Sequence, residues 1–195
     1  VDVAKEKDII TPELKKAGSK LIWIKTPKAE YDLPDYEKLM AVYEKFSEAV
    51  HTGKVLSAYV LDRHGVVPAV SKMAFGNSMG VKLSDEIPAG QLFAPAFTDI
   101  VAEVEADKID ELGFEYVEIG EVTAEPNFVY GNTVITIKEA VDAWKETLER
   151  VFKTVSGEET GSAVPEVGEE KSSDGKLGED GLFRASKVYV CEHKI

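Results

Sequence analysis

The sequence predicts an α+β fold in which helices cover a mixed β-sheet in a three-layer α/β arrangement. Two periodicities run through the chain: apolar residues at three- and four-residue steps, typical of helices, and apolar residues at alternate positions, typical of strands. Their order, β-α-β-α-β-β-α-β-β-β-α, places strands next to each other without an intervening helix, so it is not a regular βαβ repeat. The 195 residues, 44% of them hydrophobic, suffice for one sizeable core.

The first elements are predicted from two apolar runs and one long periodic segment. Residues 20–25 are a short apolar run bounded by turn formers, as in a buried strand. A helix follows, with Asp32 as its N-cap and Gly53 as its stop. Residues 54–61 are the next strand. The apolar stripe of the helix consists of Leu33, Tyr36, Leu39, Met40, Tyr43, Phe46 and Val50.

The middle of the chain is predicted to add a second helix and two strands. Residues 66–76 are predicted to be helical, and Pro68 is compatible with the first turn, where its missing N–H is harmless. Residues 81–83 are a brief strand. Residues 99–106 alternate apolar and polar positions, which predicts a strand with one buried face; the apolar positions are Ile100, Ala102 and Val104.

The last elements end in a helix with a strong start signal. A short helix is closed by Gly113, and alternation over residues 115–124 predicts a strand. Gly131-Asn132, between two further strand pieces, is a hairpin signal. Thr136 and Glu139 have the spacing of a capping box. The stripe of the helix after them consists of Ala140, Val141, Trp144, Leu148, Val151 and Phe152.

The character of the chain changes after Thr154, which predicts one domain over residues 1–154 and an appendage. Residues 155–181 hold eight acids against two lysines, seven Gly or Pro and no aromatic residue. Such a segment buries too little apolar surface to order itself, so we interpret it as an acidic flexible linker. Residues 182–195 turn apolar again and are predicted to form a terminal strand.

Composition and missing motifs exclude several functions. A net charge of −13 and the lack of a basic stripe disfavour nucleic-acid binding. No apolar run approaches the roughly 18 residues of a membrane span, and no secretion signal opens the chain, so a cytoplasmic location is expected. The single Cys191 and three distant histidines predict no metal site. No phosphate-binding loop, dinucleotide fingerprint or nucleophile elbow occurs, so no catalytic residue is assigned.

The candidate ligand-binding residues are Asp62, Arg63 and His64, which follow a predicted strand and precede a predicted helix. Proteins with α and β layers often bind ligands at such a position. An ordinary polar turn has the same composition, because Asp is a common N-cap and Arg and His on turns are commonly solvated. Asn77, after the helix, is the fourth candidate, and Gly65 is predicted to make the tight strand-to-helix turn.

Three stretches carry a resemblance to a known family. They are "DVAKEKDIITPELKKAGSKLIWI" (2–24), "VLSAYVLDRHGVVPAVSKMAFGN" (55–77) and "LFRASKVYVCEHKI" (182–195). They resemble the last synthase-like subdomain of the long, single-chain phosphoribosylformylglycinamidine synthases, including its entry segment and the lead into the glutaminase domain. The resemblance implies an aminoimidazole ribonucleotide synthetase-related C-terminal-type domain over residues 1–154. It also implies that residues 182–195 lead toward a glutaminase.

The resemblance implies a cytoplasmic ligase of purine biosynthesis as the parent enzyme. That enzyme uses ATP, Mg²⁺ and glutamine-derived ammonia to convert formylglycinamide ribonucleotide to its amidine. The partners implied for this chain are the other synthase subdomains and the glutaminase domain of the same parent, with no nucleic acid and no membrane. No cofactor is implied for the fragment itself.

The chain departs from the family at its ligand-binding motif. Many members have His-Asp-Arg-Ser-Asp-Gly-Gly before this helix; aligned without gaps on "MAF" (73–75), those positions fall on residues 59–65. Only Gly65 matches, whereas Tyr59 and Val60 replace the imidazole and the first carboxylate. A Gly-Gly-Ser loop is replaced by "KTPKAEYDLPDY" (25–36). These departures predict a structural subdomain that is inactive alone.

Two alternatives remain open from the sequence. One is a free-standing nucleotide or small-molecule binding module of the same fold, which uses the turn residues and Asn77. The other is a different member of the fold superfamily, such as a selenophosphate or hydrogenase-maturation protein. Proteins of these two kinds need an N-terminal reactive residue or a Cys at the extreme C-terminus, and Cys191 lies four residues before the end.

Overall fold

The computed structural model describes residues 9–149, 151–152, 176–177 and 183–184. The chain divides into two compact units, the first ending at Thr147 and the second beginning at Leu148. The first unit contains the sheet and nearly all of the helices.

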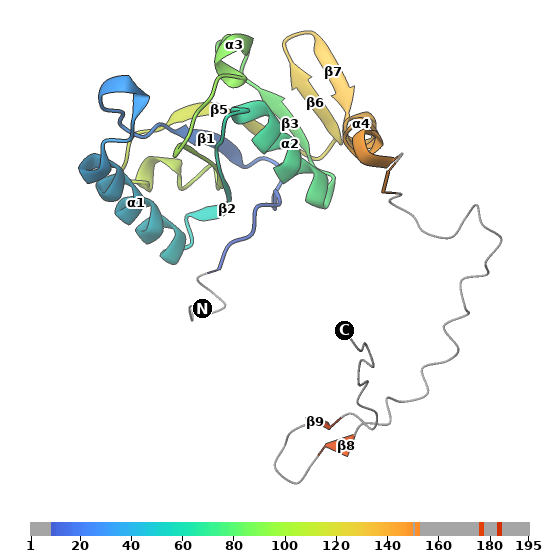
Figure 1. The fold of residues 1–195 in the computed structure, drawn as a ribbon, viewed down its shortest axis with the longest axis horizontal. Helices are drawn as coiled ribbons and strands as arrows, with labels where there is room; N and C mark the ends of the chain where they lie inside the picture. The colour runs from blue at the N-terminus through green and yellow to red at the C-terminus, as the bar shows by residue number, and fades with distance from the viewer. Residues whose placement is uncertain (1–8, 150, 153–175, 178–182, 185–195) are drawn as a thin grey trace, which may run out of the picture. The chain divides into compact units, whose positions relative to one another are not determined.

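A seven-stranded mixed sheet forms the centre of the first unit (Figure 1). Its strand order is β2-β4-β1-β5-β3-β6-β7, and every neighbouring pair is antiparallel except β3 with β6. The predicted mixed sheet is therefore confirmed. The strands are β1 (Lys20–Ile24), β2 (Val55–Val60), β3 (Gly80–Leu83), β4 (Ile100–Val104), β5 (Val117–Thr123), β6 (Asn127–Tyr130) and β7 (Thr133–Thr136).

Helices cover both faces of this sheet, as the three-layer prediction requires. They are α1 (Tyr36–His51), α2 (Val66–Asn77), the one-turn α3 (Ala89–Leu92) and α4 (Ile137–Glu149). Alternate residues of β1 point to opposite faces. Leu21 and Trp23 pack in the core cluster that contains α2. Ile22 and Ile24 pack in the cluster with Ala49 and other residues of α1. Figure 1 shows α1 at one end of the sheet, and the β6–β7 hairpin with α4 at the other.

Helix α1 begins later than the sequence predicts, and its cap is a different aspartate. Asp35, not Asp32, is the N-cap, and its side chain accepts a hydrogen bond from the Lys38 backbone N–H. Asp32 instead lies in a 3-10 turn with a positive φ of 57°. The cause is Pro34, because a residue before proline is pushed away from helical angles. Leu33 is accordingly extended, with φ −71° and ψ 148°.

Strand β4 also differs from the sequence prediction. Both of its faces are buried, whereas the sequence predicts one buried face. It lies between β2 and β1 in the sheet, and helices cover it above and below. Every one of its residues is buried, including Glu103 at 0% exposure. A charged residue in an alternating strand suggests a solvated face, but here the carboxylate is enclosed.

The end of the first unit follows the sequence closely. The β6–β7 hairpin turns at Gly131-Asn132, with a φ of 54° at Gly131. The capping box is confirmed. The Glu139 backbone N–H donates to Thr136 Oγ1 at 3.1 Å, and the Thr136 backbone N–H donates to Glu139 Oε2 at 3.0 Å. Only the start of the predicted stripe is partly buried, whereas Trp144 is 59% exposed and contacts Phe75 with its ring.

The second unit contains a short antiparallel pair, β8 (Lys176–Leu177) with β9 (Phe183–Arg184). Strand β8 falls within the predicted linker, and β9 falls at the start of the predicted terminal segment. The rest of both segments, including the predicted strand around Val188 and Val190, lies outside the described residues. Across the described residues, the helices are too short or too polar to cross a membrane.

Candidate functional site

Three loops meet at one end of the sheet and form the candidate site. Ile24, at the end of β1, and Val60, at the end of β2, both pair with Ile100, the first residue of β4. The segments beyond them, residues 25–35, 61–65 and 93–99, are therefore neighbours in space. The sequence-predicted turn Asp62-Arg63-His64 belongs to this end.

The polar side chains of the turn bond mainly to one another. Asp62 Oδ1 accepts from the His64 backbone N–H at 2.8 Å and lies 3.1 Å from the His64 ring Nδ1. Arg63 Nε donates to His64 Nε2 at 3.2 Å. The backbone hydrogen bond from His64 is the main reason that the pKa of Asp62 lies below its ordinary value. The carboxylate thus stabilises its own turn, and the outer faces of Arg63 and His64 remain exposed.

Gly65 brings the backbone of the turn into close contact with the 92–94 segment. Its φ of 78° and ψ of −159° lie in a region that is essentially restricted to glycine. A Cβ there would lie 2.5 Å from the Ala94 carbonyl oxygen and 2.8 Å from that of Leu92. Gly65 is also the N-cap of α2, so it fixes where this helix starts.

The structure does not bring Asn77 together with the other three candidates. Asn77 ends α2, a helix of 12 residues, and so lies about 17 Å from the turn at a rise of about 1.5 Å per residue. Its side-chain Nδ2 donates to the Leu14 carbonyl oxygen at 2.8 Å. Asn77 therefore holds the segment before β1 against α2.

Asp99 is the residue at this end that the sequence analysis missed. It is 5% exposed, and its carboxylate accepts hydrogen bonds from three residues. Trp23 Nε1 donates at 2.9 Å, the Thr26 backbone N–H at 2.9 Å, and Thr26 Oγ1 at 2.8 Å. Lys28 Nζ adds an ion pair at 3.2 Å. The signal available in the sequence was an aspartate directly before an apolar strand, which alone does not reveal its partners.

Thr98, next to Asp99, has a strained backbone that the same network holds in place. Its φ is 70°, which is an outlier for a β-branched residue. Its Oγ1 lies 2.8 Å from Lys28 Nζ and 2.7 Å from Thr26 Oγ1, and its carbonyl oxygen accepts from Tyr43 Oη at 2.7 Å. Because strain of this kind persists only where surrounding contacts enforce it, this network keeps the loops at the site rigid.

Replacing Tyr43 by phenylalanine is expected to lower the free energy of unfolding by about 1 kcal/mol, because the bond to Thr98 is lost. Desolvation, and then the negative charge of Asp99, raise the pKa of Tyr43. The folded state therefore disfavours the phenolate, and stability falls as pH rises through the alkaline range. Tyr43→Phe should show less of this fall in urea unfolding measured from about pH 8 to 11, the range around the ordinary tyrosine pKa.

The matched control is Tyr36→Phe, because Tyr36 is 72% exposed and precedes Tyr43 on the same helix. We expect this variant to unfold like the unmodified chain at every pH. If the two variants lost the same free energy of unfolding, the Tyr43 hydroxyl would not stabilise the loop that contains Thr98.

Chemically, the site offers an exposed guanidinium and imidazole but no assembled metal centre. Within the described residues, no three His, Cys, Asp or Glu side chains are grouped closely enough to share an ion. Tyr59 and Val60, at the end of β2, do not supply ligands either: Tyr59 Oη accepts from Lys72 Nζ at 3.3 Å, and Val60 is an exposed hydrocarbon.

Comparison with solved structures identifies the fold. The chain matches phosphoribosylformylglycinamidine synthase II from Thermotoga maritima at 15% identity, with a TM-score of 0.58 over 69% of this chain and 28% of that one. PurLQS from the same organism matches at 16% identity with a TM-score of 0.60, over 69% of this chain and 28% of that one. T. maritima PurL complexed with ATP matches at 15% identity with a TM-score of 0.56, over 70% of this chain and 28% of that one.

These matches establish an aminoimidazole ribonucleotide synthetase-like α+β fold. The chain spans a little more than a quarter of the length of the proteins it matches. At such low identity the likeness concerns the fold alone. No family model matches the sequence.

Proposed function

We propose that this chain is a structural subdomain of a phosphoribosylformylglycinamidine synthase, namely the last synthase-like subdomain before the glutaminase. The observation that carries the proposal is the shared fold over about 69% of the chain with a synthase of that activity. The three sequence stretches that resemble the long, single-chain enzymes give the finer placement. In this proposal, residues 155–181 connect the subdomain to the glutaminase.

The parent enzyme would be a cytoplasmic ligase that uses ATP, Mg²⁺ and glutamine-derived ammonia. Within that enzyme, the partners of this subdomain would be the other synthase subdomains and the glutaminase domain of the same parent chain. The subdomain would contribute a rigid sheet end, held by Asp99 and Lys28, against which neighbouring domains pack.

The residues of this chain do not fit Mg²⁺ binding by the turn. The imidazole and carboxylate of the family motif are replaced by Tyr59 and Val60. The carboxylate of the turn, Asp62, already accepts the His64 backbone N–H. We therefore assign no catalytic step to this subdomain.

The test uses the 195-residue chain with ATP, Mg²⁺, formylglycinamide ribonucleotide and ammonia. We expect no amination or ATP hydrolysis above background, and no saturable NMR shifts at residues 62–65 when MgATP is added. Turnover above background would reject the structural role. The control is an unrelated inert protein, purified in the same way and at the same concentration, which sets the background for contaminating ATPase activity.

The alternative function is a free-standing nucleotide-binding module. It is favoured by the exposed guanidinium and imidazole of Arg63 and His64, which lie beside the N-terminus of α2. Saturable MgATP shifts at these residues, lost in an Arg63→Ala variant, would favour this module over the structural role. The gene sequence on either side adds a second test, because an upstream synthase-like domain and a downstream glutaminase are expected only for the subdomain.

A further inference from the structure

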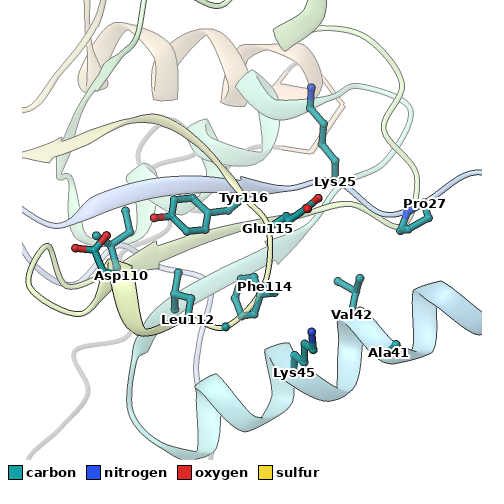
Figure 2. A pocket seen from close by; sticks show the side chains of 12 residues that line it. Lys25, Pro27, Ala41, Val42, Lys45, Asp110, Leu112, Phe114, Glu115 and Tyr116 are labelled. Carbon is teal, nitrogen blue, oxygen red and sulfur yellow. The ribbon is translucent and has the colours of Figure 1, made fainter.

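A hollow of about 540 Å³ lies between α1 and the segment that leads into β5 (Figure 2). This volume is within the range of small-ligand sites in proteins. Its floor is apolar, from Val42 on α1 and from Leu112 and Phe114 on the opposite wall. Phe114 is fixed in place by a ring contact with Phe46, at 6.4 Å between centroids. The hollow is therefore a formed feature of the fold.

Four of the polar side chains around this hollow have no partner among the described residues. Lys45, Asp110, Glu115 and Tyr116 form no side-chain hydrogen bond or ion pair with any residue that the structure describes. Two charged groups near Asp110 do have partners: Lys108 pairs with Glu105 at 2.7 Å, and Glu111 pairs with Lys54 at 3.8 Å. The four side chains at the hollow itself remain unpaired within the described part of the chain.

The charged groups that line the hollow are of both signs, two carboxylates and two lysines. Asp110 and Glu115 supply the carboxylates, and Lys45 projects its ammonium from α1 (Figure 2). Lys25 also lines the hollow, but its ammonium points away and lies 4.2 Å from the centre of the Trp23 ring. The chain as a whole carries a net charge of −13, which attracts cations to it from a distance.

The chemistry of the walls selects one kind of cation. A carboxylate binds a guanidinium through two parallel hydrogen bonds, and a flat guanidinium also stacks on aromatic rings. Glu115 lies between two aromatic residues in sequence, Phe114 and Tyr116, and all three line the hollow. Lys45 on the other wall is free to bind a carboxylate or carbonyl oxygen.

We propose that this hollow is a binding site for an arginine group, with Glu115 binding the guanidinium, Phe114 and Tyr116 providing aromatic surface, and Lys45 binding an acceptor oxygen of the ligand. The arginine comes either from the free amino acid or from a peptide. The proposal is independent of the proposed function, because it uses none of the residues at the turn 62–65.

The experiment follows the ¹⁵N-labelled 195-residue chain by NMR during titration with L-arginine, L-citrulline and the blocked tripeptide acetyl-Gly-Arg-Gly-amide. Citrulline has nearly the shape of arginine without its charge. We expect arginine or the tripeptide to cause saturable shifts at Phe114, Glu115 and Tyr116, with a dissociation constant on the order of millimolar, as befits a few contacts in an open site. Citrulline should cause none.

Two variants separate the roles of the walls. Glu115→Gln should weaken binding about tenfold or more, because it removes the charged acceptor, whereas Glu118→Gln, on the same stretch but outside the hollow, should not. Lys45→Met should weaken binding of L-arginine through its carboxylate and leave the blocked tripeptide unaffected. Because Glu115 and Lys45 are exposed, both variants should fold normally, as circular dichroism can verify.

The titrations either support or overturn the proposed arginine site. The site is supported if L-arginine or the tripeptide binds, citrulline does not, and Glu115→Gln weakens the binding. The compound that binds then identifies the source of the arginine group. The proposal is overturned if neither arginine compound causes a saturable shift, or if citrulline binds as tightly as arginine. It is also overturned if Glu115→Gln and Glu118→Gln bind arginine with equal affinity. None of these results depends on whether the chain belongs to a synthase.

Discussion

Replacing Glu103 by glutamine is expected to lower the free energy of unfolding by about 2–4 kcal/mol. The carboxylate is fully buried in β4 and accepts four hydrogen bonds. The donors are the Lys15 backbone N–H at 2.8 Å, the Lys16 backbone N–H at 2.9 Å, Ser19 Oγ at 2.7 Å and Ser57 Oγ at 2.8 Å. Each carboxylate oxygen has two of these donors.

The physical reason is that glutamine keeps the shape of the side chain but not its acceptors. One of its two terminal atoms is an NH₂ group, which faces a backbone N–H and a hydroxyl. The hydroxyl can rotate to accept, but the backbone N–H has no alternative partner and stays buried without a bond. The segment around Lys15 and Lys16 should detach from the sheet as a result.

Urea unfolding monitored by circular dichroism measures this loss, with Glu118→Gln as the control. Glu118 is a strand glutamate, 47% exposed, in an ion pair with Lys20 at 2.8 Å. We expect the control to lose less than about 1 kcal/mol, as is usual for exposed pairs. If both variants lost the same amount, the buried carboxylate would not be the anchor of the leading segment.

Replacing Gly65 by alanine is expected to lower the free energy of unfolding by about 2–5 kcal/mol. Two costs combine. The backbone at φ 78° is strained for any residue with a Cβ, and the new methyl group would lie 2.5 Å from a backbone carbonyl oxygen. Because the obstructing atoms belong to the main chain, the 92–94 segment must move as a unit to make room.

The control variant Gly53→Ala distinguishes the cost of backbone strain from the cost of the steric clash. Gly53 also has a positive φ, 69°, but nothing lies within 4 Å of the position that an alanine methyl group would occupy there. This control should lose only about 1–2 kcal/mol, from backbone strain alone. Thermal and urea unfolding of the two variants give the difference directly. A Gly65→Ala variant as stable as Gly53→Ala would mean that the turn relaxes away from the 92–94 segment at little cost.

The regular elements could be predicted from the sequence because their signals are local. The capping box at Thr136 and Glu139 and the hairpin at Gly131 depend on residues within a few positions of each other, and both are present. The start of α1 was placed wrongly although its signal is also local. The effect of Pro34 on Leu33 outweighs the capping tendency of Asp32.

The buried acids could not be predicted because their environment depends on strand order. Glu103 receives bonds from residues 46 to 88 positions away, and Asp99 from residues 71 to 76 positions away. No periodicity within β4 reveals that β1 and β2 lie on either side of it. The separation of Asn77 from the turn has a local cause instead, because the helix predicted over residues 66–76 lies between them and sets their distance.

The position of β1 in the sheet has a consequence for how the chain folds. The strand occupies residues 20–24, yet both of its neighbours, β4 and β5, lie at residues 100–123. On a ribosome, β1 therefore emerges long before either partner exists, and closing so long a loop is entropically costly. Folding should be slow, with the centre of the sheet assembling in one late step. Until then the apolar strand depends on chaperones or on transient collapse to avoid aggregation.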